Sequence, residues 1–323
     1  MKGKTILLSF LLGVVLPWSC YLIADRLQCT DVTETKPTEV ELALVETRPT
    51  EETAASCIIP VIQANGIIEE MELETYLVGA VLGEMPASFE LEALKAQAIA
   101  ARTFALRRFS GYQKHEGGAV CCDAACCQAY CDPGEYASAE GLEKVFEAVH
   151  ATENTVLTYQ GELIEATYFS CSGGKTEEAV AVWGTDVPYL QSVDSPGEER
   201  SDHYVDTVTF SRESFQNCLG ISLSGSPESW LGAVTYTAGG GVDTMEIGGT
   251  SFQGTKLRQL LGLRSTAFVM TAVGETVTVT TKGFGHRVGM SQYGADAMAV
   301  SGATYQQILN HYYPGTSLEI WQG

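Results

Sequence analysis

The sequence predicts an α+β fold in which a helical N-terminal part packs on a mostly antiparallel β region. Two helical patterns come early, at residues 71–85 and 89–109. Mostly β-type runs broken by glycine clusters follow over residues 205–282, and a last helix follows a glycine-rich loop near the C-terminus. Helices followed by strands, with no repeat of fixed period, are typical of α+β domains rather than of alternating α/β ones.

The composition excludes some functions. The chain has 323 residues, of which 45% are apolar, enough for a substantial core. It carries 40 acidic and 19 basic residues, for a net charge of -21. A nucleic-acid binder needs a basic surface to meet phosphates, and a polybasic membrane-surface protein needs clustered lysine and arginine. We therefore expect no nucleic-acid partner.

The N-terminus contains an uncharged run long enough to cross a bilayer. Residues 5–24 form a twenty-residue stretch preceded by Lys2 and Lys4. Basic residues before such a run favour a cytoplasmic N-terminus. A cleaved signal peptide or a lipoprotein modified at Cys20 are the alternatives, but no small-x-small cleavage site follows. We expect residues 1–25 to be a single-pass membrane anchor.

The next segment has the composition of a tether. Residues 26–56 are rich in threonine and glutamate and contain no aromatic side chain, so they cannot bury enough apolar surface to fold alone. We expect a disordered acidic linker here. Residues 57–323 should then form the α+β domain that carries the chemistry, either as one body or as two lobes with a cleft between them.

One glutamate stands at the joint between the first two helices. An apolar stripe at helical spacing runs over residues 73–81, and Glu84 lies four residues past Ala80 on the same side. Pro86 ends the helix directly afterwards. A carboxyl group on the apolar side is partly desolvated, so its pKa rises and it suits general acid catalysis. A solvated carboxylate at a helix end remains the alternative.

The second helix, 89–109, is rich in alanine, which allows the two helices to approach closely. Ser88 is the expected N-cap because its side chain can accept from the first free N–H groups of the helix. This packing would place Glu84 at a hinge between the two helices.

A cysteine-rich loop follows the second helix. Five of the ten cysteines lie within eleven residues of the stretch HEGGAVCCDAACCQAYC. His115, Cys121 and Cys127 are evenly spaced, six residues apart, and suit Zn²⁺ with a fourth position filled by another ligand or by water. A disulfide cluster that leaves Cys131 unpaired is the alternative. The spacing favours the metal.

Two glycine-containing loops offer further polar side chains. Ser170 and Ser172 precede Gly173-Gly174, but the stretch is not the G-x-S-x-G of a serine nucleophile, which favours a tight turn or a substrate-contact loop. The stretch GFGHRVGMSQYGA at 283–295 contains His286, Gln292 and Tyr293 among four glycines. A strand-to-helix connection with a satisfied histidine is the simpler interpretation. Trp183 and Tyr189 suit either sugar stacking or a core, and we expect core positions for both.

Several stretches together resemble a known family. They are, in chain order, GEMPASFELEALKAQAIAARTFAL, CCDAACCQAY, YFSCSGGKTEEAVAVWGTDVPYLQSVDSPGEE, GGTSFQGTKLRQLLGLRSTAF and GFGHRVGMSQYGA. The order and content resemble the stage II sporulation protein D family, lytic transglycosylases of endospore-forming Firmicutes. The resemblance extends over residues 58–322.

The resemblance implies a reaction. Family members cleave the bond between N-acetylmuramic acid and N-acetylglucosamine in peptidoglycan glycan strands stripped of stem peptides, during engulfment of the forespore. The products carry 1,6-anhydro-muramic ends. The family's motif glutamate falls on Glu84, and a single acid/base carboxyl agrees with the physical interpretation of the helix joint.

The resemblance also implies a set of metal ligands. Some clostridial members of the family bind zinc through one histidine and two cysteines at a spacing that matches His115, Cys121 and Cys127. Cys126 stands where many members have histidine, which leaves the ligand set open. The zinc is expected to be structural. Arg287 replaces a glycine common in the family, so the role of its loop is open. The expected sugar contacts are Ser170, Ser172, His286, Gln292 and Tyr293.

The family context implies partners and a location. The implied partners are the amidase stage II sporulation protein P and the membrane protein stage II sporulation protein M. The implied location is the mother-cell membrane around the forespore, with the catalytic domain on the extracytoplasmic side. Three other functions stay open: a lysozyme-like hydrolase using Asp186 or Asp194, a zinc peptidase or amidase using the cysteine loop, and a non-catalytic glycan-binding or scaffold subunit. The sequence contains no H-E-x-x-H motif, which argues against the zinc enzyme.

Overall fold

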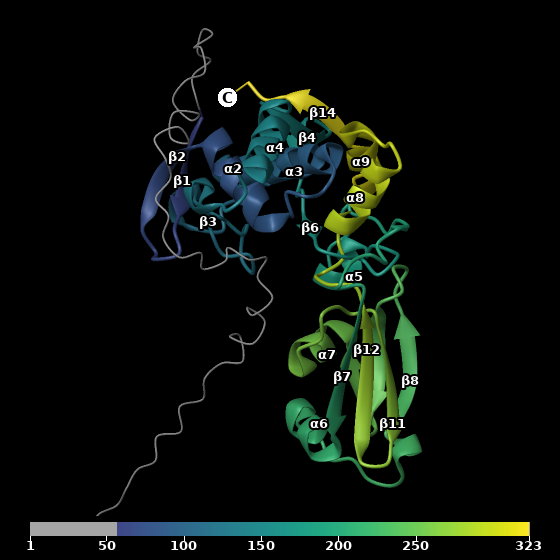
Figure 1. Ribbon diagram of the computed structural model, residues 1–323. Helices are drawn as coiled ribbons and strands as arrows, with labels where there is room; N and C mark the ends of the chain where they lie inside the picture. Colours follow the sequence, from purple (N-terminus) through teal and green to yellow (C-terminus); the bar gives the residue numbers. More distant parts are fainter. Residues whose placement is uncertain (1–56, 323) are drawn as a thin grey trace, which may run out of the picture.

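The computed structural model describes residues 57–322, arranged as a helical body and a β-rich body (Figure 1). The expected anchor at 1–25 and the linker at 26–56 lie outside the described residues. Within the described range, no helix combines the length and apolarity that crossing a membrane requires.

The described helices and strands follow the predicted order. The helices are α2 (Leu73–Glu84), α3 (Leu91–Phe109), α4 (Ala139–His150), α5 (Ala179–Trp183), α6 (Arg212–Leu219), α7 (Gly254–Leu261), α8 (Gln292–Val300) and α9 (Tyr305–Tyr312). The strands are β1 (Ile58–Ile62), β2 (Ile68–Glu72), β3 (Val120–Cys121), β4 (Thr155–Tyr159), β5 (Glu162–Leu163), β6 (Tyr168–Phe169), β7 (Val205–Ser211), β8 (Leu231–Tyr236), β9 (Val242–Ile247), β10 (Thr250–Gln253), β11 (Phe268–Val273), β12 (Thr276–Lys282), β13 (Met290–Ser291) and β14 (Ser317–Ile320).

The strand pairings confirm the α+β class with mostly antiparallel sheets. The antiparallel sheets have the orders β14-β4-β5, β11-β12-β7 and β10-β9-β8. The β1–β2 hairpin is also antiparallel, whereas β3 pairs with β1, and β13 with β6, in parallel. The two parallel pairs are short, with two residues in register each, and both lie in the helical body.

The helical body is built around α3. Its alanines pack at no measurable exposure against α2, α4, β4, α8 and α9, so the small side chains predicted to allow close helix approach do so. Arg102 is also fully buried in α3. Its guanidinium donates to both carboxylate oxygens of Glu74 in α2, at 2.8 and 2.6 Å, and to the carbonyls of Val149 and Thr155. A buried cation is tolerated because its donors are satisfied in this way.

The start of α3 differs from the prediction. The helix begins after Glu90, and Ser88 is exposed and does not cap it. The N–H of Glu90 instead donates to the carboxylate of Asp296 in α8, at 2.6 Å. Asp296 is buried and also pairs with Arg200. The cap predicted for Ser88 is therefore wrong: α3 has no side-chain cap, and the distant carboxylate fixes the residue that precedes the helix.

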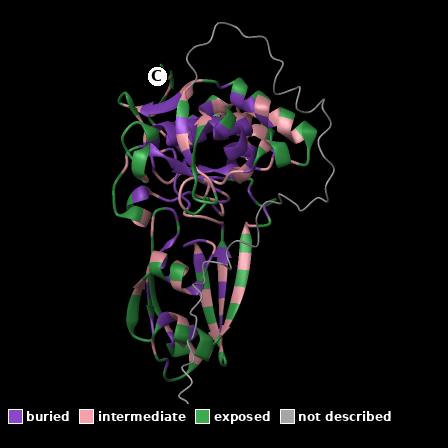
Figure 2. Cartoon of the chain, turned by 90° about the vertical axis from the view of Figure 1, so that its left-hand side faces the viewer, coloured by how far each residue is buried: buried purple, intermediate pink, exposed green. Residues whose placement is uncertain are grey.

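The β-rich body has its own hydrophobic core. Phe215 of α6, Trp230, and Leu257 of α7 are fully buried between the two three-stranded sheets and their helices. Strand β7 alternates between exposed and half-buried side chains, and β12 between buried and half-buried ones, which gives the striped colouring of the strands in Figure 2. Helix α6 was not predicted; it is short and starts at Ser211, whose hydroxyl accepts from the Ser214 N–H.

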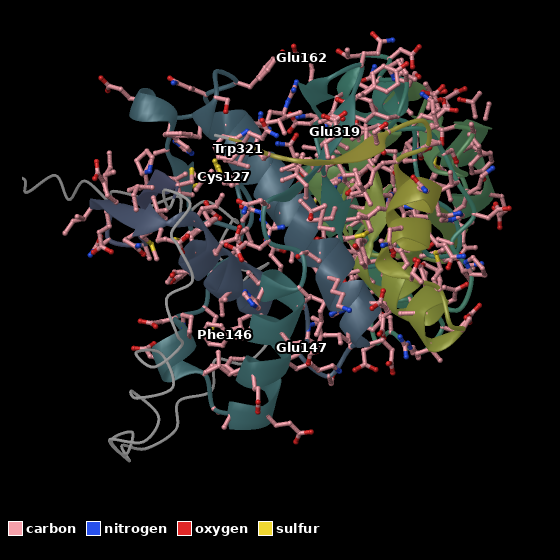
Figure 3. All side chains as sticks on the ribbon, turned by 90° about the horizontal axis from the view of Figure 1, so that it is seen from above. Cys127, Phe146, Glu147, Glu162, Glu319 and Trp321 are labelled. Atoms are coloured by element: carbon pink, nitrogen blue, oxygen red, sulfur yellow. The ribbon has the colours of Figure 1, made fainter. Side chains whose placement is uncertain are left out.

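The chain enters and leaves the β-rich body at neighbouring points. Val205 opens β7 and Lys282 closes β12, and the two are register partners in the sheet. The helical body is made from segments on both sides, since its core extends from Ile59 to Tyr313. Seen from above, the exposed residues Glu147, Glu162 and Glu319 lie at the edge of this body (Figure 3).

A buried ion pair connects the two bodies. Arg287, at a φ of +66°, donates to the carbonyls of Ser172 and Lys175 and to that of Gly239 in the β8–β9 hairpin, at 2.7–2.8 Å. Its Nη1 lies 3.5 Å from the carboxylate of Glu177, which accepts from the Gly239 N–H. Arg287, whose role the sequence left open, therefore links the 283–289 loop to the β8–β9 hairpin.

Candidate functional site

The predicted acid and the cysteine loop border the same cavity. The cavity has a volume of about 430 Å³. It lies where the end of α2, the end of α3, the cysteine loop and the 283–289 loop meet. Its wall combines aromatic, charged and sulfur-bearing side chains: Glu84, Phe104, Arg108, Lys114, Ala124, Ala125, Cys126, Cys127, Glu165, Ala166, Thr167, Tyr168, Trp183 and His286.

Glu84 is the last residue of α2 and is half-buried in the cavity wall. The Ala129 N–H donates to its Oε1 at 2.5 Å. Burial raises its pKa from 4.5 to about 7, although this hydrogen bond opposes the rise. The Gln292 amide also opposes it, yet Nε2 of Gln292 has no hydrogen-bond partner among the described residues. Gln292 thus stands near the carboxylate without a full hydrogen bond.

Two tyrosines and a glutamine form a neutral network beside Glu84. Tyr76 donates to Oε1 of Gln128 at 2.9 Å, and Nε2 of Gln128 donates to the Tyr168 hydroxyl at 2.8 Å. Burial raises the pKa of both tyrosines well above 10, and the charge on Glu84 adds to this. Both phenols therefore stay protonated, and neither of them competes with Glu84 as a base.

His286 faces the same cavity as a neutral ring. Burial lowers its pKa to about 4, with smaller contributions from Arg258 and Lys114. Its Nδ1 accepts from the Val288 N–H at 3.1 Å, so in the neutral ring Nε2 carries the proton. The ring centroid lies 5.4 Å from that of Trp183. At this site His286 is a hydrogen-bond donor, not a proton acceptor.

Trp183 corrects an expectation. The sequence favoured a core position, but Trp183 is 45% exposed and lines the cavity. It ends the five-residue helix α5, and the left-handed Gly184 that follows turns the chain away. Tyr189, in contrast, is buried, and its hydroxyl accepts from the Glu165 N–H at 3.0 Å. An exposed indole beside an acid suits stacking on a sugar ring.

The cysteine loop brings four donor groups together. The ligand atoms of His115, Cys121, Cys126 and Cys127 all lie within 4.8 Å of one another, and the three thiols are free. Cys126 thus joins the three residues predicted from spacing. Cys122 stands apart, with its thiol directed to Gln63 at 3.6 Å. Three thiols and one imidazole form a donor set that fits a tetrahedral structural Zn²⁺ site.

Ser172 does not face the cavity. It is fully buried, and its hydroxyl donates to Oε2 of Glu198 at 2.8 Å. Glu198 also accepts from the Gly173 N–H and from the hydroxyls of Ser195 and Ser291. This carboxylate ties three loops together. The sequence offered no local pattern for it, because its donors come from segments up to 93 residues away.

Ser170 and Tyr293 also lie outside the cavity lining. The Tyr293 N–H donates to the Ser170 carbonyl at 3.1 Å. The Tyr293 ring packs edge-on against Phe89, with 5.0 Å between centroids. Tyr293, in the first turn of α8, thus contacts both the loop that follows β6 and the segment that precedes α3. Of the five expected sugar contacts, His286 is the one among the cavity-lining side chains.

A second carboxylate, that of Glu165, borders the cavity, but it is paired with two arginines. Glu165 accepts from Arg107 at 3.2 Å and from Arg108. The two aspartates considered for a hydrolase, Asp186 and Asp194, are exposed and do not line the cavity. Glu84 is therefore the carboxyl group in the cavity wall that has no ion-pair partner among residues 57–322.

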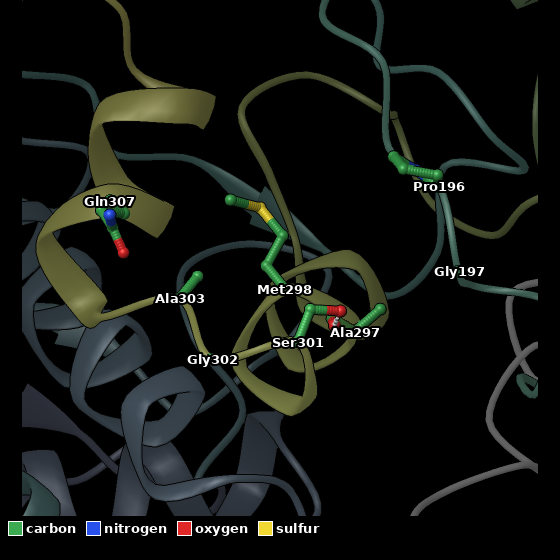
Figure 4. A pocket seen from close by; sticks show the side chains of 8 residues that line it. All are labelled: Pro196, Gly197, Ala297, Met298, Ser301, Gly302, Ala303 and Gln307. Atoms are coloured by element: carbon green, nitrogen blue, oxygen red, sulfur yellow. Dashed lines mark hydrogen bonds between the residues drawn. The ribbon is translucent and has the colours of Figure 1, made fainter.

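A larger cavity lies elsewhere in the helical body. It measures about 610 Å³ and lies between the 196–197 turn and helices α8 and α9 (Figure 4). Small and apolar residues dominate its wall, which includes Ala297, Met298 and Ala303 but no titratable side chain. It cannot perform acid–base chemistry, so the smaller cavity is the candidate active site.

Comparisons with known proteins agree with these features. Residues 63–159 match the SpoIID family model, described as Stage II sporulation protein. The chain is 42% identical over 295 residues to Stage II sporulation protein D of Bacillus subtilis (strain 168), covering 87% of this chain and 85% of the relative. It is 42% identical over 264 residues to the protein of the same name in Bacillus amyloliquefaciens, covering 79% and 76%. It is also 31% identical over 301 residues to the Amidase enhancer of Bacillus subtilis (strain 168), covering 75% of this chain and 40% of that protein. The chain belongs to the stage II sporulation protein D family.

Proposed function

We propose that this protein is a peptidoglycan lytic transglycosylase that acts on peptide-stripped glycan strands. The observation that supports this most is Glu84, a carboxyl group with its pKa raised to about 7 in the wall of a cavity. A glutamate with this pKa is protonated in a useful fraction near neutral pH and can also accept a proton later in the same turnover.

The reaction needs one carboxyl group in two roles. Glu84 first donates its proton to the oxygen of the muramic acid–glucosamine bond, and the bond from C1 to that oxygen breaks. The resulting carboxylate then takes the proton of the C6 hydroxyl, whose oxygen forms a bond to C1 of the same sugar. The product is a 1,6-anhydro end, no water is consumed, and Glu84 regains its proton.

Other cavity residues fit supporting roles. The exposed face of Trp183 would stack on a sugar ring, and the Nε2–H of His286 would donate to a sugar hydroxyl or amide oxygen. A glycosidase that retains or inverts configuration needs a second carboxylate at the scissile bond. Glu165 is occupied by two arginines, which favours the single-carboxyl reaction over hydrolysis.

The four-donor cluster would hold Zn²⁺ in a structural role. His115, Cys121, Cys126 and Cys127 would complete a closed tetrahedral shell, which leaves no position for water or substrate. When bound, the metal would order the loop that carries Cys126 and Cys127 into the cavity wall. No step of the proposed reaction depends on it.

The proposed setting is the sporulating cell. The family resemblance supports anchorage through residues 1–25 in the mother-cell membrane around the forespore, with residues 57–323 on the extracytoplasmic side. It also supports stage II sporulation proteins P and M as partners. A second candidate function is a non-catalytic glycan-binding or scaffold subunit. The name of one relative, Amidase enhancer, favours that candidate because it describes an action on another enzyme.

Product analysis separates these functions. The full-length protein is incubated with peptide-free glycan strands, and products are identified by mass spectrometry beside Glu84→Gln. Glu143→Gln, an exposed glutamate of α4, is the matched control. The transglycosylase predicts anhydro ends from wild type and from the control but not from Glu84→Gln. Products heavier by one water indicate a hydrolase, and bound but uncleaved glycan indicates the scaffold.

A further inference from the structure

The cavity wall is richer in cations than the chain as a whole. In a protein with a net charge of -21, Arg108 and Lys114 both line the cavity, and Arg107 lies behind it on Glu165. Glu165 is shared between the two arginines. With Glu84 protonated when it acts and Glu165 paired with the two arginines, the ammonium of Lys114 is left without a carboxylate partner among the lining side chains. Neutral sugar rings do not require such a charge.

Of the two cations that line the cavity, Lys114 is the one without a carboxylate partner among residues 57–322. Its Nζ donates to the Cys126 carbonyl and lies 5.9 Å from the centre of the Phe104 ring. Within residues 57–322 it forms no ion pair. Arg108, in contrast, is buried and donates to Glu165 and to the Tyr112 carbonyl. Lys114 is exposed, so its ammonium can exchange the carbonyl for a ligand anion without burying a charge.

The substrate of the proposed function carries one carboxylate that is present only after its stem peptide has been removed. Muramic acid carries a lactyl ether whose carboxyl group is an uncharged amide while a stem peptide is attached. Removal of the peptide frees it as a carboxylate. This group is on the same sugar ring whose C1 reacts at Glu84, so it enters the same cavity.

We propose that Lys114 binds the free lactyl carboxylate of muramic acid and thereby selects glycan strands that have lost their stem peptides. The proposal rests on the proposed function and assigns its substrate selectivity to one side chain. An ammonium–carboxylate hydrogen bond stabilises the bound strand, whereas an amide offers no charge and its peptide must also fit beside the cysteine loop. Selectivity for stripped strands would follow without any contact from a partner protein.

The test compares two substrates that differ at that group. Peptide-free strands are used as prepared or after their lactyl carboxylates are converted to methylamides. The full-length protein is assayed for anhydro ends as wild type, Lys114→Gln, Lys114→Arg and Lys256→Gln; Lys256 is an exposed lysine of α7 that bonds only Gln259. Zinc content and circular dichroism are measured for each variant, because Lys114 adjoins His115.

For the wild type, we expect kcat/KM to be about tenfold higher on the carboxylate strands than on the methylamide strands. The difference should come from a lower KM rather than from a higher kcat. Lys114→Gln should bring the kcat/KM values of the two substrates within about twofold of each other. Lys114→Arg should keep most of the preference, and Lys256→Gln all of it. A retained preference in Lys114→Gln, or none in wild type, with anhydro ends still formed, overturns the assignment and leaves the proposed function intact.

Failure of the proposed function has a different signature. If neither strand yields anhydro ends, binding of both strands is measured by calorimetry with the same four proteins. A carboxylate preference that Lys114→Gln abolishes then supports the assignment for a binding protein. Equal binding of both strands refutes it together with the proposed function.

Discussion

The raised pKa of Glu84 predicts a pH-dependent gain in stability when this glutamate is replaced by glutamine. Glutamine keeps the size of the side chain and an oxygen that can accept from the Ala129 N–H. It removes the charge that burial opposes. The pKa of Glu84 is about 7 in the folded protein against 4.5 for an ordinary glutamate. At about 1.4 kcal/mol per pKa unit, this difference corresponds to about 3 kcal/mol.

The sign follows from proton binding. Between pH 4.5 and 7 the folded protein keeps a proton on Glu84 that the unfolded chain releases, so the free energy of unfolding falls as pH rises. Above pH 7 both states are charged and the full cost is present. Because Glu84 borders an open cavity, water screens part of the cost, and we expect about 2 kcal/mol. Glu84→Gln should therefore gain about 2 kcal/mol over wild type between pH 4 and pH 8.5.

Urea unfolding at several pH values measures this difference. Circular dichroism reports mainly the helical body, which contains the longest helices and Glu84. Other titrating groups act equally in both proteins, so they cancel in the comparison. Glu143→Gln should show no pH-dependent gain. A stability difference between Glu84→Gln and wild type that stays constant from pH 4 to 8.5 would refute the argument that burial raises this pKa.

Four further outcomes are expected. The kcat/KM for anhydro ends should fall about tenfold per pH unit above pH 7, as Glu84 loses its proton. Cys126→Ser should lower the zinc content measured by atomic emission, because a hydroxyl is a poor zinc ligand. Glu198→Ala should lower the free energy of unfolding in urea by about 3 kcal/mol or more, because it leaves buried hydroxyl and N–H donors unpaired. Arg287→Ala should cost about 3–5 kcal/mol in the same assay, since Glu177 becomes an unpaired buried charge.

Each outcome has a control or a contrary result. A pH-independent kcat/KM from pH 5 to 9 would exclude Glu84 as the acid. Cys122→Ser, beside the cluster but outside it, should keep its metal. Glu199→Ala changes an exposed neighbour of Glu198 and should cost little. Glu275→Ala removes the exposed partner of Arg212, and a loss equal to that of Arg287→Ala would contradict the role of burial.

Local patterns predicted the elements well. The apolar stripe before Glu84 and the alanine-rich run after it became α2 and α3, because helix periodicity and small side chains act within a few residues. The α+β class followed from element order. Helix α6 was missed because its eight residues lie within a region, 205–282, that the sequence pattern indicated as mostly strands. The cap predicted at Ser88 was wrong because α3 begins later, at Leu91, and the preceding Glu90 is held by Asp296, which is 206 residues away.

The site was predictable where its residues are close in sequence. The even spacing of His115, Cys121 and Cys127 predicted three members of the donor cluster, and the fold added Cys126. The meeting of Glu84 with His286 across 202 positions required the family resemblance, since no spacing rule spans that distance. Ser172 looked accessible because it precedes two glycines, yet the loop folds inward around a carboxylate that the sequence does not mark.

The neighbouring positions of Val205 and Lys282 have a consequence for the order of folding. All residues of the β-rich core lie between these two positions, so it can form as soon as that segment is free to fold. The helical core must wait, because β4 pairs with β14 and α3 packs on α8 and α9, all translated afterwards. The segment inserted in the middle of the chain thus folds first, and the segment translated first completes its fold last.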